Sequence, residues 1–309
     1  MFDVRRLKVL REVAARGSFS GAAEGLAFTQ SAVSQQIAAL EREAGTTLVE
    51  RGARGVRLTE AGQALVRHAD AILARLDDAE QELAAIAGLR GGRLRLGSFP
   101  SAGVTLVPQA AAAFHERYPD VELRLVEAEP EDALPLLRAG EIDLTLAYDY
   151  EPAPEPTAPD IERLPLLDDP LEVVLPRGHR LAGQARVAAG ELDGEPWITG
   201  PPPGSCARMT LHTCRTAGFE PKVAFESNDC QTMQAFVAAG VGVALLPRLG
   251  LSPLNAAVEV RPLDPPAARR VWAAWLAEGY RSPASAAMLE ILREVSRGFG
   301  APVELAAAS

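Results

Sequence analysis

The residues from Thr29 to Gln35 are mostly small and polar, and their chemistry suits hydrogen bonding to the edges of base pairs. Thr29 is expected to cap a helix, because its hydroxyl can accept from a free N–H group of the first turn. Glutamine can pair with adenine in the major groove of DNA, and serine can contact several bases. We therefore expect one helix to present its N-terminal side chains to DNA, namely Thr29, Gln30, Ser31, Ser34 and Gln35.

Three helices should position this polar face, because apolar residues recur at helical spacing in three consecutive segments. The first helix is expected to end near Arg16, with Gly17 as its stop, and Ser18 or Ser20 should cap the second. Adjacent alanines on the second helix allow close helix packing. The three apolar faces are Leu7, Leu10 and Val13, then Ala22, Ala23 and Leu26, then Val33, Ile37 and Leu40.

A short hairpin is predicted over residues 48–58, after a turn at Gly45. Three arginines in it can contact phosphates or reach into a minor groove, and they should set affinity more than specificity. They are Arg51, Arg54 and Arg57. The alternative is a helical hairpin that packs against another protein, with solvated arginines. The order of the features favours a winged helix-turn-helix over residues 1–60.

The residues of this segment also match a known family pattern. The matching residues are Gly17-Ser18-Phe19, Ala22-Ala23, Leu26, Ser31-Ala32-Val33-Ser34, Ile37, Leu40-Glu41, Gly45, Arg51 and Leu58-Thr59-Glu60-Ala61-Gly62. Through them the chain resembles the LysR-type transcriptional regulator family. Val49 departs from the pattern, since the family usually has phenylalanine just before the wing. The resemblance implies a DNA-binding regulator of transcription that responds to a small-molecule effector, with RNA polymerase as a further candidate partner.

The composition is that of a globular protein, since 48% of the 309 residues are hydrophobic. No apolar run approaches the roughly 20 residues that span a bilayer, and the first residues lead into an amphipathic helix rather than a signal peptide. We therefore expect a cytoplasmic protein with no membrane partner. The net charge of −10 is uneven: residues 1–60 hold nine Lys/Arg and seven Asp/Glu, or +2, which leaves −12 for the remainder. This division should weaken non-specific adhesion to DNA.

A long linker helix is predicted from Thr59 to about Leu89, and it forms most of a segment assigned to residues 61–90. Apolar residues recur there in heptads, as Leu65, Ile72, Ala79 and Ile86 with Ala69, Leu76 and Leu83 between them. This spacing predicts a dimer seam, and a helix lying on its own domain is the alternative. The family resemblance implies a homodimer, usually paired further into a homotetramer, and hence DNA half-sites with dyad character.

Strands alternate with helices over residues 91–305, which predicts an α/β region with a largely parallel sheet. Lobe I is assigned to about 91–166 and 264–300, and lobe II to about 167–263. The expected strands are 93–97, 121–127, 142–147, 171–175, 197–198, 223–226, 241–246 and 269–276, and the expected helices are 106–118, 132–139, 231–239 and 284–298. The lobes should be joined by two crossings, near 164–171 and 260–264. The fold class is therefore α + α/β.

The cleft between the lobes is the expected ligand site. Further matching residues are Leu94-Arg95-Leu96-Gly97, Tyr118-Pro119, Gly140-Glu141-Ile142-Asp143-Leu144 and Ala238-Ala239-Gly240-Val241-Gly242-Val243-Ala244-Leu245-Leu246-Pro247. They resemble the family's effector-binding region, which is itself similar to periplasmic solute-binding proteins. The resemblance implies an effector pocket lined by Phe99, Ser101, Ala102, Ala147, Tyr148, Gly204 and Ser205.

The charge of the ligand stays open at this point. Helices that begin near Ser101 and Ser205 have free N–H groups that attract anions, although a serine that merely caps its helix has the same geometry. Four acidic residues near the same strand ends could instead favour an amine or a neutral polar ligand. They are Glu127, Glu129, Asp149 and Asp229.

Three cysteines, Cys206, Cys214 and Cys230, fall in lobe II. Cys206 is expected at a helix start, which can lower a thiol pKa, and Cys214 follows eight residues later. Peroxide-sensing members of the family have a reactive cysteine and a resolving partner at similar places, so a thiol-based redox sensor is an alternative function. Two helical turns would separate these sulfurs, and a buried small apolar role is the simpler interpretation. The spacing of Cys206, His212 and Cys214 fits no zinc pattern, so no metal is expected.

Catalysis is the remaining class of function, together with solute transport. The sequence has no nucleophile elbow, HExxH motif or Walker loop. Its histidines are scattered, at His68, His115, His179 and His212. A solute carrier would need secretion and has no use for residues 1–60. We therefore expect neither an enzyme nor a cofactor.

Overall fold

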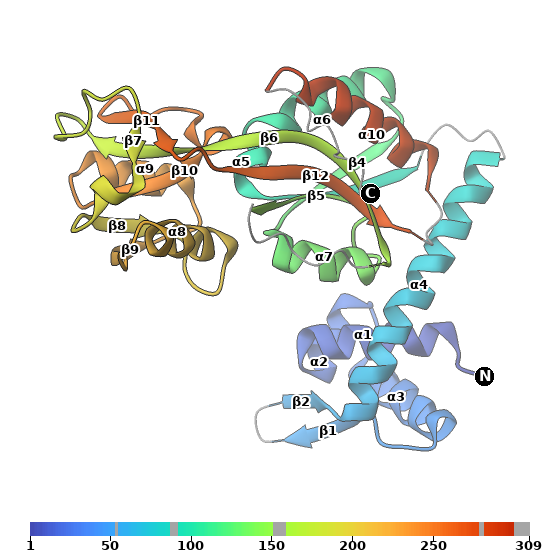
Figure 1. Cartoon of the computed structure of the whole chain (residues 1–309). Helices are drawn as coiled ribbons and strands as arrows, with labels where there is room; N and C mark the ends of the chain where they lie inside the picture. The colour runs from blue at the N-terminus through green and yellow to red at the C-terminus, as the bar shows by residue number, and fades with distance from the viewer. Residues whose placement is uncertain (53–54, 87–91, 151–158, 278–280, 300–309) are drawn as a thin grey trace. The chain divides into compact units, whose positions relative to one another are not determined.

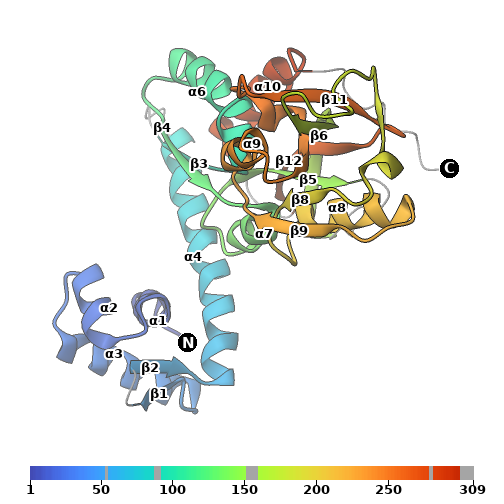
Figure 2. The same cartoon turned by 90° about the vertical axis from the view of Figure 1, so that its left-hand side faces the viewer.

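In a computed structural model of the chain, the described residues are 1–52, 55–86, 92–150, 159–277 and 281–299 (Figures 1 and 2). The chain divides into two compact units, one of residues 1–89 with 138–141 and one of residues 90–137 with 142–309. Among the described residues, no helix is both long and apolar enough to cross a membrane.

The first unit begins with three helices, each capped by a neighbouring side chain. Asp3 caps the first helix, Ser18 rather than Ser20 caps the second, and Thr29 caps the third. Gly17 ends the first helix with a φ of 62°, which glycine adopts at little cost. The helices are α1 (Val4–Arg16), α2 (Phe19–Gly25) and α3 (Gln30–Ala44), and their predicted apolar faces form one core in which Leu26 is partly buried.

The wing is an antiparallel hairpin of β1 (Val49–Gly52) and β2 (Gly55–Leu58), with Val49 opposite Leu58. Val56 N donates to Gly17 O at 2.9 Å, which ties the hairpin to the turn between α1 and α2. A Cβ on Gly55 would lie 2.7 Å from the same oxygen, so only glycine fits there. Val49, the departure from the family pattern, is buried in the core of this unit.

The predicted linker helix is α4 (Glu60–Ile86). Gly62 near its start lies against the wing, because a Cβ there would be 2.0 Å from Leu48 O. The heptad pattern divides into two parts. Leu65 and Ala69 are buried in the core of the first unit, so their assignment to a dimer seam is wrong. Three other seam residues, Ile72, Leu76 and Leu83, are exposed in the single chain.

The second unit is built on one twisted sheet with the strand order β4-β3-β5-β12-β6-β10-β8-β9 (Figure 1). One end of this sheet and its helices make up lobe I. These elements are β3 (Arg93–Ser98), α5 (Pro100–Gly103), α6 (Leu106–Arg117), β4 (Glu122–Glu127), α7 (Pro130–Arg138), β5 (Leu144–Tyr150) and α10 (Pro283–Ser296). The other end makes up lobe II. Its elements are β7 (Val187–Ala188), β8 (Pro196–Thr199), α8 (Ser205–Thr216), β9 (Lys222–Glu226), α9 (Cys230–Ala238), β10 (Val243–Pro247) and β11 (Val258–Asp264), with short 3₁₀ helices η1 (Ala189–Leu192) and η2 (Arg248–Leu251).

Two long strands join the lobes, and Figure 1 shows them side by side between the two ends of the sheet. They are β6 (Ile161–Pro176) and β12 (Ala268–Leu276). The first part of β6 pairs with β12, and its last part pairs with β10 and β11 of lobe II. Both strands run antiparallel to their neighbours, whereas the outer pairs β3–β4 and β8–β9 are parallel. The sheet is therefore mixed, and the expectation of a largely parallel sheet holds only toward its edges.

Each lobe has a buried cluster on either face of the sheet. In lobe I, one cluster includes Phe114 of α6 and Leu292 of α10, and the other includes Leu137 of α7. In lobe II, separate clusters include Cys214 of α8 and Val237 of α9. This arrangement confirms the predicted winged helix-turn-helix, linker helix and two-lobed α/β region.

Candidate functional site

The polar face of α3 is fixed at its start by Thr29. The Thr29 hydroxyl accepts from Ala32 N at 3.2 Å and lies 3.0 Å from the hydroxyl of Ser31. The predicted DNA-contacting residues Gln30, Ser31 and Gln35 are exposed, and Ser34 is half-buried. The opposite face, with Val33, Ile37 and Leu40, is buried. The helix thus presents neutral hydrogen-bonding groups outward from a rigid support.

Some side chains of α3 are held by hydrogen bonds inside the first unit, whereas others are exposed and can face DNA. The Glu41 carboxylate accepts from the backbone N–H groups of Leu48 and Val49, at 2.9 and 3.2 Å, and so joins α3 to the wing. The Gln36 side chain accepts from Arg6 Nε at 3.3 Å, and it is half-buried. Its neighbour Gln35 is exposed.

The three wing arginines are described to different extents. Arg57 is an exposed residue of β2. Arg51 lies in β1, but its side chain is outside the described residues, as is the whole of Arg54.

A cavity of about 320 Å³ lies between lobe I and lobe II. Four of the predicted effector residues line it, namely Ser101, Tyr148, Gly204 and Ser205. The other three, Phe99, Ala102 and Ala147, are fully buried in the sheet clusters and are not part of the lining. The lining also includes Glu129, Glu131, Cys206, Cys230 and Arg269. Of these five, Glu131 and Arg269 are the charged residues that sequence patterns alone do not indicate.

Arg269 of β12 supplies a buried positive charge to this cavity. Its Nε donates to Asp169 Oδ2 at 2.9 Å, and its Nη2 donates to Ser101 Oγ at 2.6 Å. The guanidinium lies over the rings of Phe99 and Tyr148, 4.7 and 4.6 Å from their centres. Burial alone would lower the pKa of Arg269, but the Asp169 carboxylate more than offsets that effect and raises it. Arg269 therefore stays charged, with Asp169 as its counterion.

Tyr148 carries a second polar group of the cavity. Its hydroxyl donates to Glu129 Oε2 at 2.9 Å, and its ring meets those of Phe99 and Tyr150 edge to face. Burial raises the pKa of Glu129, although the hydrogen bond from Tyr148 acts in the opposite direction. Burial also raises the pKa of Tyr148, so this phenol stays neutral and remains a donor.

The N-terminus of α8 forms the lobe II side of the cavity. Gly204 stands at the N-cap position and offers no side chain. A carboxylate from lobe I takes that role, because Glu131 Oε1 accepts from Ser205 N at 3.1 Å and from the Ser205 hydroxyl at 2.5 Å. Arg208, one turn along α8, donates to Ser205 Oγ at 3.0 Å and lies 3.6 Å from Glu131.

The other acidic residues considered for ligand binding are in different settings. Asp149 is paired with Arg163 at 3.5 Å. Asp229 caps α9, and the hydroxyl of Thr232 followed by backbone N–H groups lowers its pKa. Glu127 is exposed on the edge strand β4. Of the four, Glu129 is the one that lines the cavity.

The cysteine environments oppose thiolate formation. Burial raises the pKa of Cys206, despite hydrogen bonds at its sulfur that act in the opposite direction. Cys214 is fully buried in the cluster under α8, and burial raises its pKa to about 12. A reactive thiol needs a lowered pKa and access, so neither sulfur has the properties of a peroxide-sensing nucleophile in this conformation.

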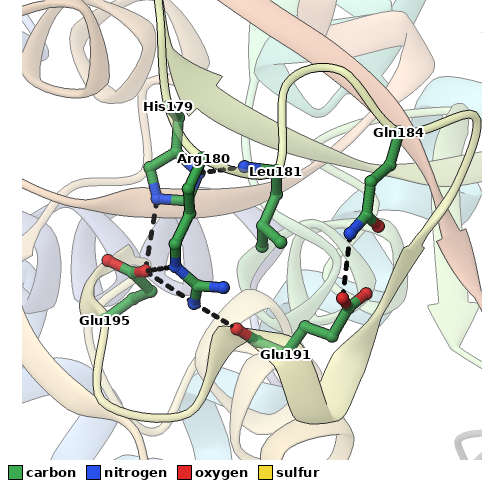
Figure 3. A network of polar contacts seen from close by, with 6 residues as sticks. All are labelled: His179, Arg180, Leu181, Gln184, Glu191 and Glu195. Carbon is green, nitrogen blue, oxygen red and sulfur yellow. Dashed lines mark hydrogen bonds and ion pairs between the residues drawn. The ribbon is translucent and has the colours of Figure 1, made fainter.

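His179 belongs to a polar network in lobe II (Figure 3). The Glu195 carboxylate lies 3.2 Å from His179 Nε2 and accepts from Arg180 at 3.0 Å. Gln184 donates to Glu191 at 2.9 Å, and this hydrogen bond is the main cause of a lowered pKa of Glu191. These contacts join residues 179–184 to Glu191 and Glu195, so the network holds this loop of lobe II together. Among the described residues, no group of three or more His, Cys, Asp or Glu could hold a metal ion.

A second hollow of about 790 Å³ lies behind α8, lined mainly by small residues such as Ala189, Pro266 and Ala268. It contains none of the predicted effector residues, and buried charged groups do not converge on it. A specific ligand site combines apolar walls with a few convergent polar groups, which describes the smaller cavity better.

Comparisons with known proteins agree with this architecture. Residues 4–63 match the family described as bacterial regulatory helix-turn-helix protein, lysR family, and residues 87–297 match the LysR substrate binding domain. The probable HTH-type transcriptional regulator LrrA of Synechococcus elongatus is 33% identical over 95% of this chain and 97% of its own. A probable hydrogen peroxide-inducible genes activator of Mycobacterium avium is 37% identical over 78% of this chain and 76% of its own.

The solved structure of a full-length OxyR variant from Pseudomonas aeruginosa has the same fold, with a TM-score of 0.70. It covers 95% of this chain and 98% of its own at 24% sequence identity. Both family models and the full-length relatives therefore agree with the winged helix, the linker helix and the two-lobed region. The chain belongs to the LysR family of helix-turn-helix transcriptional regulators.

Proposed function

We propose that this regulator recognises its DNA site through the exposed polar residues of α3, with the wing arginines as phosphate contacts. The observation that carries the proposal is the row Gln30, Ser31 and Gln35, exposed at the start of a helix whose other face is buried. Neutral side chains there can distinguish base edges, whereas the arginines bind every sequence alike. The DNA-contacting set is thus Thr29, Gln30, Ser31, Ser34, Gln35, Arg51 and Arg54.

The effector is a small molecule bound in the cavity between the lobes. Ser101, Tyr148 and Ser205 are its proposed polar contacts, and Arg269 joins them as a residue that holds Ser101 in place. Phe99 supports the pocket from beneath Arg269 rather than by direct contact. Effector binding changes DNA binding only through a difference in affinity between two lobe arrangements.

The proposed assembly is a homodimer through α4, with further pairing into a homotetramer. Ile72, Leu76 and Leu83 support it, because large apolar side chains exposed along one helix are typical of an interface. Two copies of α3 would then meet two half-sites related by a dyad. The working division of the chain is 1–60, 61–90 and 91–305, in a cytoplasmic protein without catalytic activity.

Binding measurements on the DNA that flanks the protein's own gene test the proposal. Gln35→Ala should weaken binding to the cognate site by about 1–3 kcal/mol and leave binding to random duplex unchanged. Gln36→Ala is the matched control, since Gln36 accepts a hydrogen bond from Arg6 within the protein. Arg54→Ala should weaken both duplexes equally and lower the salt dependence. Equal losses on cognate and random DNA for Gln35→Ala would contradict base reading.

A further inference from the structure

Helix α8 begins without a cap from its own sequence. The first N–H groups of a helix have no partner within it, and a side chain of the N-cap residue usually accepts from one of them. Gly204 occupies that position here and has no side chain to offer. The positive end of the helix dipole also favours a negative charge at this position. A carboxylate supplies both the hydrogen-bond acceptor and the charge.

Glu131 of lobe I supplies that carboxylate. It lies in the first turn of α7, and one of its oxygens accepts from both the backbone N–H and the hydroxyl of Ser205. Arg208 folds back from the next turn, donates to Ser205 Oγ and approaches the same carboxylate at 3.6 Å. The Glu131 carboxylate of lobe I therefore meets three groups of lobe II across the cavity. They are the backbone N–H and hydroxyl of Ser205 and the guanidinium of Arg208.

This contact lies at the rim of the cavity rather than at its inner wall. The Glu131 and Arg208 side chains are 40% and 49% exposed, whereas Tyr148 and Arg269 on the inner wall are buried. Ion pairs at such exposure are weak, because water and salt compete with them. The rim contact is therefore one that a carboxylate from solution can replace, unlike the buried pair of Arg269 and Asp169.

We propose that Glu131 is a tethered competitor of the effector, which fills the carboxylate site at the N-terminus of α8 and holds the rim of the cleft closed while no effector is bound. A carboxylate-bearing effector exchanges with Glu131 at Ser205 and so breaks the bridge between the lobes as it binds. This inference rests on the proposed effector cavity for its regulatory meaning. Its test requires neither DNA nor effector. The bridge by Glu131 can therefore fail its test while DNA recognition stands, and DNA recognition can fail while the bridge stands.

Two native thiols report on opening of the rim. Cys206 and Cys230 line the cavity. Cys214, on the inner face of α8, is fully buried and serves as an internal control for folding. The experiment measures the rate at which iodoacetamide alkylates each cysteine of the full-length protein, with sites separated by peptide mass spectrometry. The test variant is Glu131→Ala. The matched control is Glu220→Ala, which removes an exposed 2.7 Å pair with Arg215 at the other end of α8.

Glu131→Ala should speed alkylation of Cys206 and Cys230 by about three- to tenfold, the range for a partly exposed hydrogen bond to a charged group. Cys214 should stay unreactive in every protein, and Glu220→Ala should match the parent at the two cavity thiols. In the parent protein, added acetate should speed alkylation of Cys206 and Cys230 by displacing Glu131 from the α8 site, and chloride at equal ionic strength should not.

Unchanged rates at both cavity thiols in Glu131→Ala would overturn the bridge. Parent alkylation rates that acetate raises no more than chloride does would overturn the claim that the start of α8 is a carboxylate site. A simultaneous rise at Cys214 would show general unfolding, and in that case Glu131→Gln takes the place of Glu131→Ala. This variant keeps an acceptor for Ser205 but loses the charge, so parent-like rates at the cavity thiols in it would overturn a role for the carboxylate.

Discussion

Helices α3 and α8 begin in contrasting ways. Thr29, the residue next to α3, caps it, and the polar side chains that follow stay exposed. The start of α8 is capped by Glu131, which is 74 residues away and belongs to the other lobe. A local cap leaves the helix start available to an external partner, whereas a distant cap makes the helix start part of the tertiary structure. The DNA-binding unit therefore depends on local interactions, and the effector cleft depends on long-range ones.

Removal of a buried long-range pair should have the largest effect. Arg269→Leu leaves Asp169 charged and buried without its counterion, which should lower the free energy of unfolding of the second unit by about 3–5 kcal/mol. All three tryptophans, Trp197, Trp272 and Trp275, lie in this unit, so fluorescence during urea unfolding follows it alone.

Arg124→Ala provides the control for that measurement. It removes an ion pair with Glu122 that is more than half exposed, and its effect should stay below about 1 kcal/mol. An equal effect of the two substitutions would show that the cleft does not depend on its buried charge pair.

Removal of a local cap should have an intermediate effect. Thr29→Ala deprives Ala32 N of its acceptor and should destabilise the first unit by about 1 kcal/mol, while Thr29→Ser should keep the cap. Residues 1–89 contain no tryptophan, so the loss should appear in far-ultraviolet circular dichroism and not in fluorescence. A matching change in tryptophan emission would contradict the assignment of this effect to the first unit.

Relief of local backbone strain should have a smaller and opposite effect. Ala27, in the turn before α3, has a φ of 53°, a conformation that costs most L-residues about 1 kcal/mol. Ala27→Gly should therefore stabilise the first unit by roughly 0.5 kcal/mol, since the added freedom of glycine in the unfolded chain offsets part of the gain. A lower melting temperature of the helical signal would show that this turn is not strained.

The smallest expected effect is a dependence of the stability of the second unit on pH. Burial raises the pKa of Glu129, so the folded chain retains its proton more strongly than the unfolded chain. Stability from this group is full below the ordinary carboxyl pKa of about 4.3 and is lost as the pH rises through the raised value. Glu129→Gln, which keeps an acceptor for Tyr148, should gain stability relative to the parent across that interval. A stability difference between Glu129→Gln and the parent that shrinks as the pH rises would contradict this prediction.

The local part of this comparison is predictable from sequence, and the long-range part is not. Gly17, Ser18 and Thr29 can be assigned as a stop and caps because each lies beside the helix it serves. The pairing of Arg269 with Asp169 joins residues 100 positions apart and depends on the register of β12 against β6. No spacing rule within the chain indicates that register.

The linker helix illustrates a second limit. An apolar heptad suits packing on a neighbouring helix as well as a dimer seam, so the sequence alone assigns Leu65 and Ala69 to the wrong surface. Their burial in the first unit leaves Ile72, Leu76 and Leu83 as the exposed apolar residues of α4. The dimer proposal therefore depends on a shorter stretch than the heptads indicate.

Selection from a pool of randomised duplexes, at moderate salt and with the full-length protein, tests the central claim most directly. We predict enrichment of two dyad-related half-sites, with a base preference that changes in Gln35→Ala and persists in Gln36→Ala. Recovery of unselected sequence by the parent protein, or an unchanged preference in Gln35→Ala, would contradict the assignment of the exposed face of α3 to base reading.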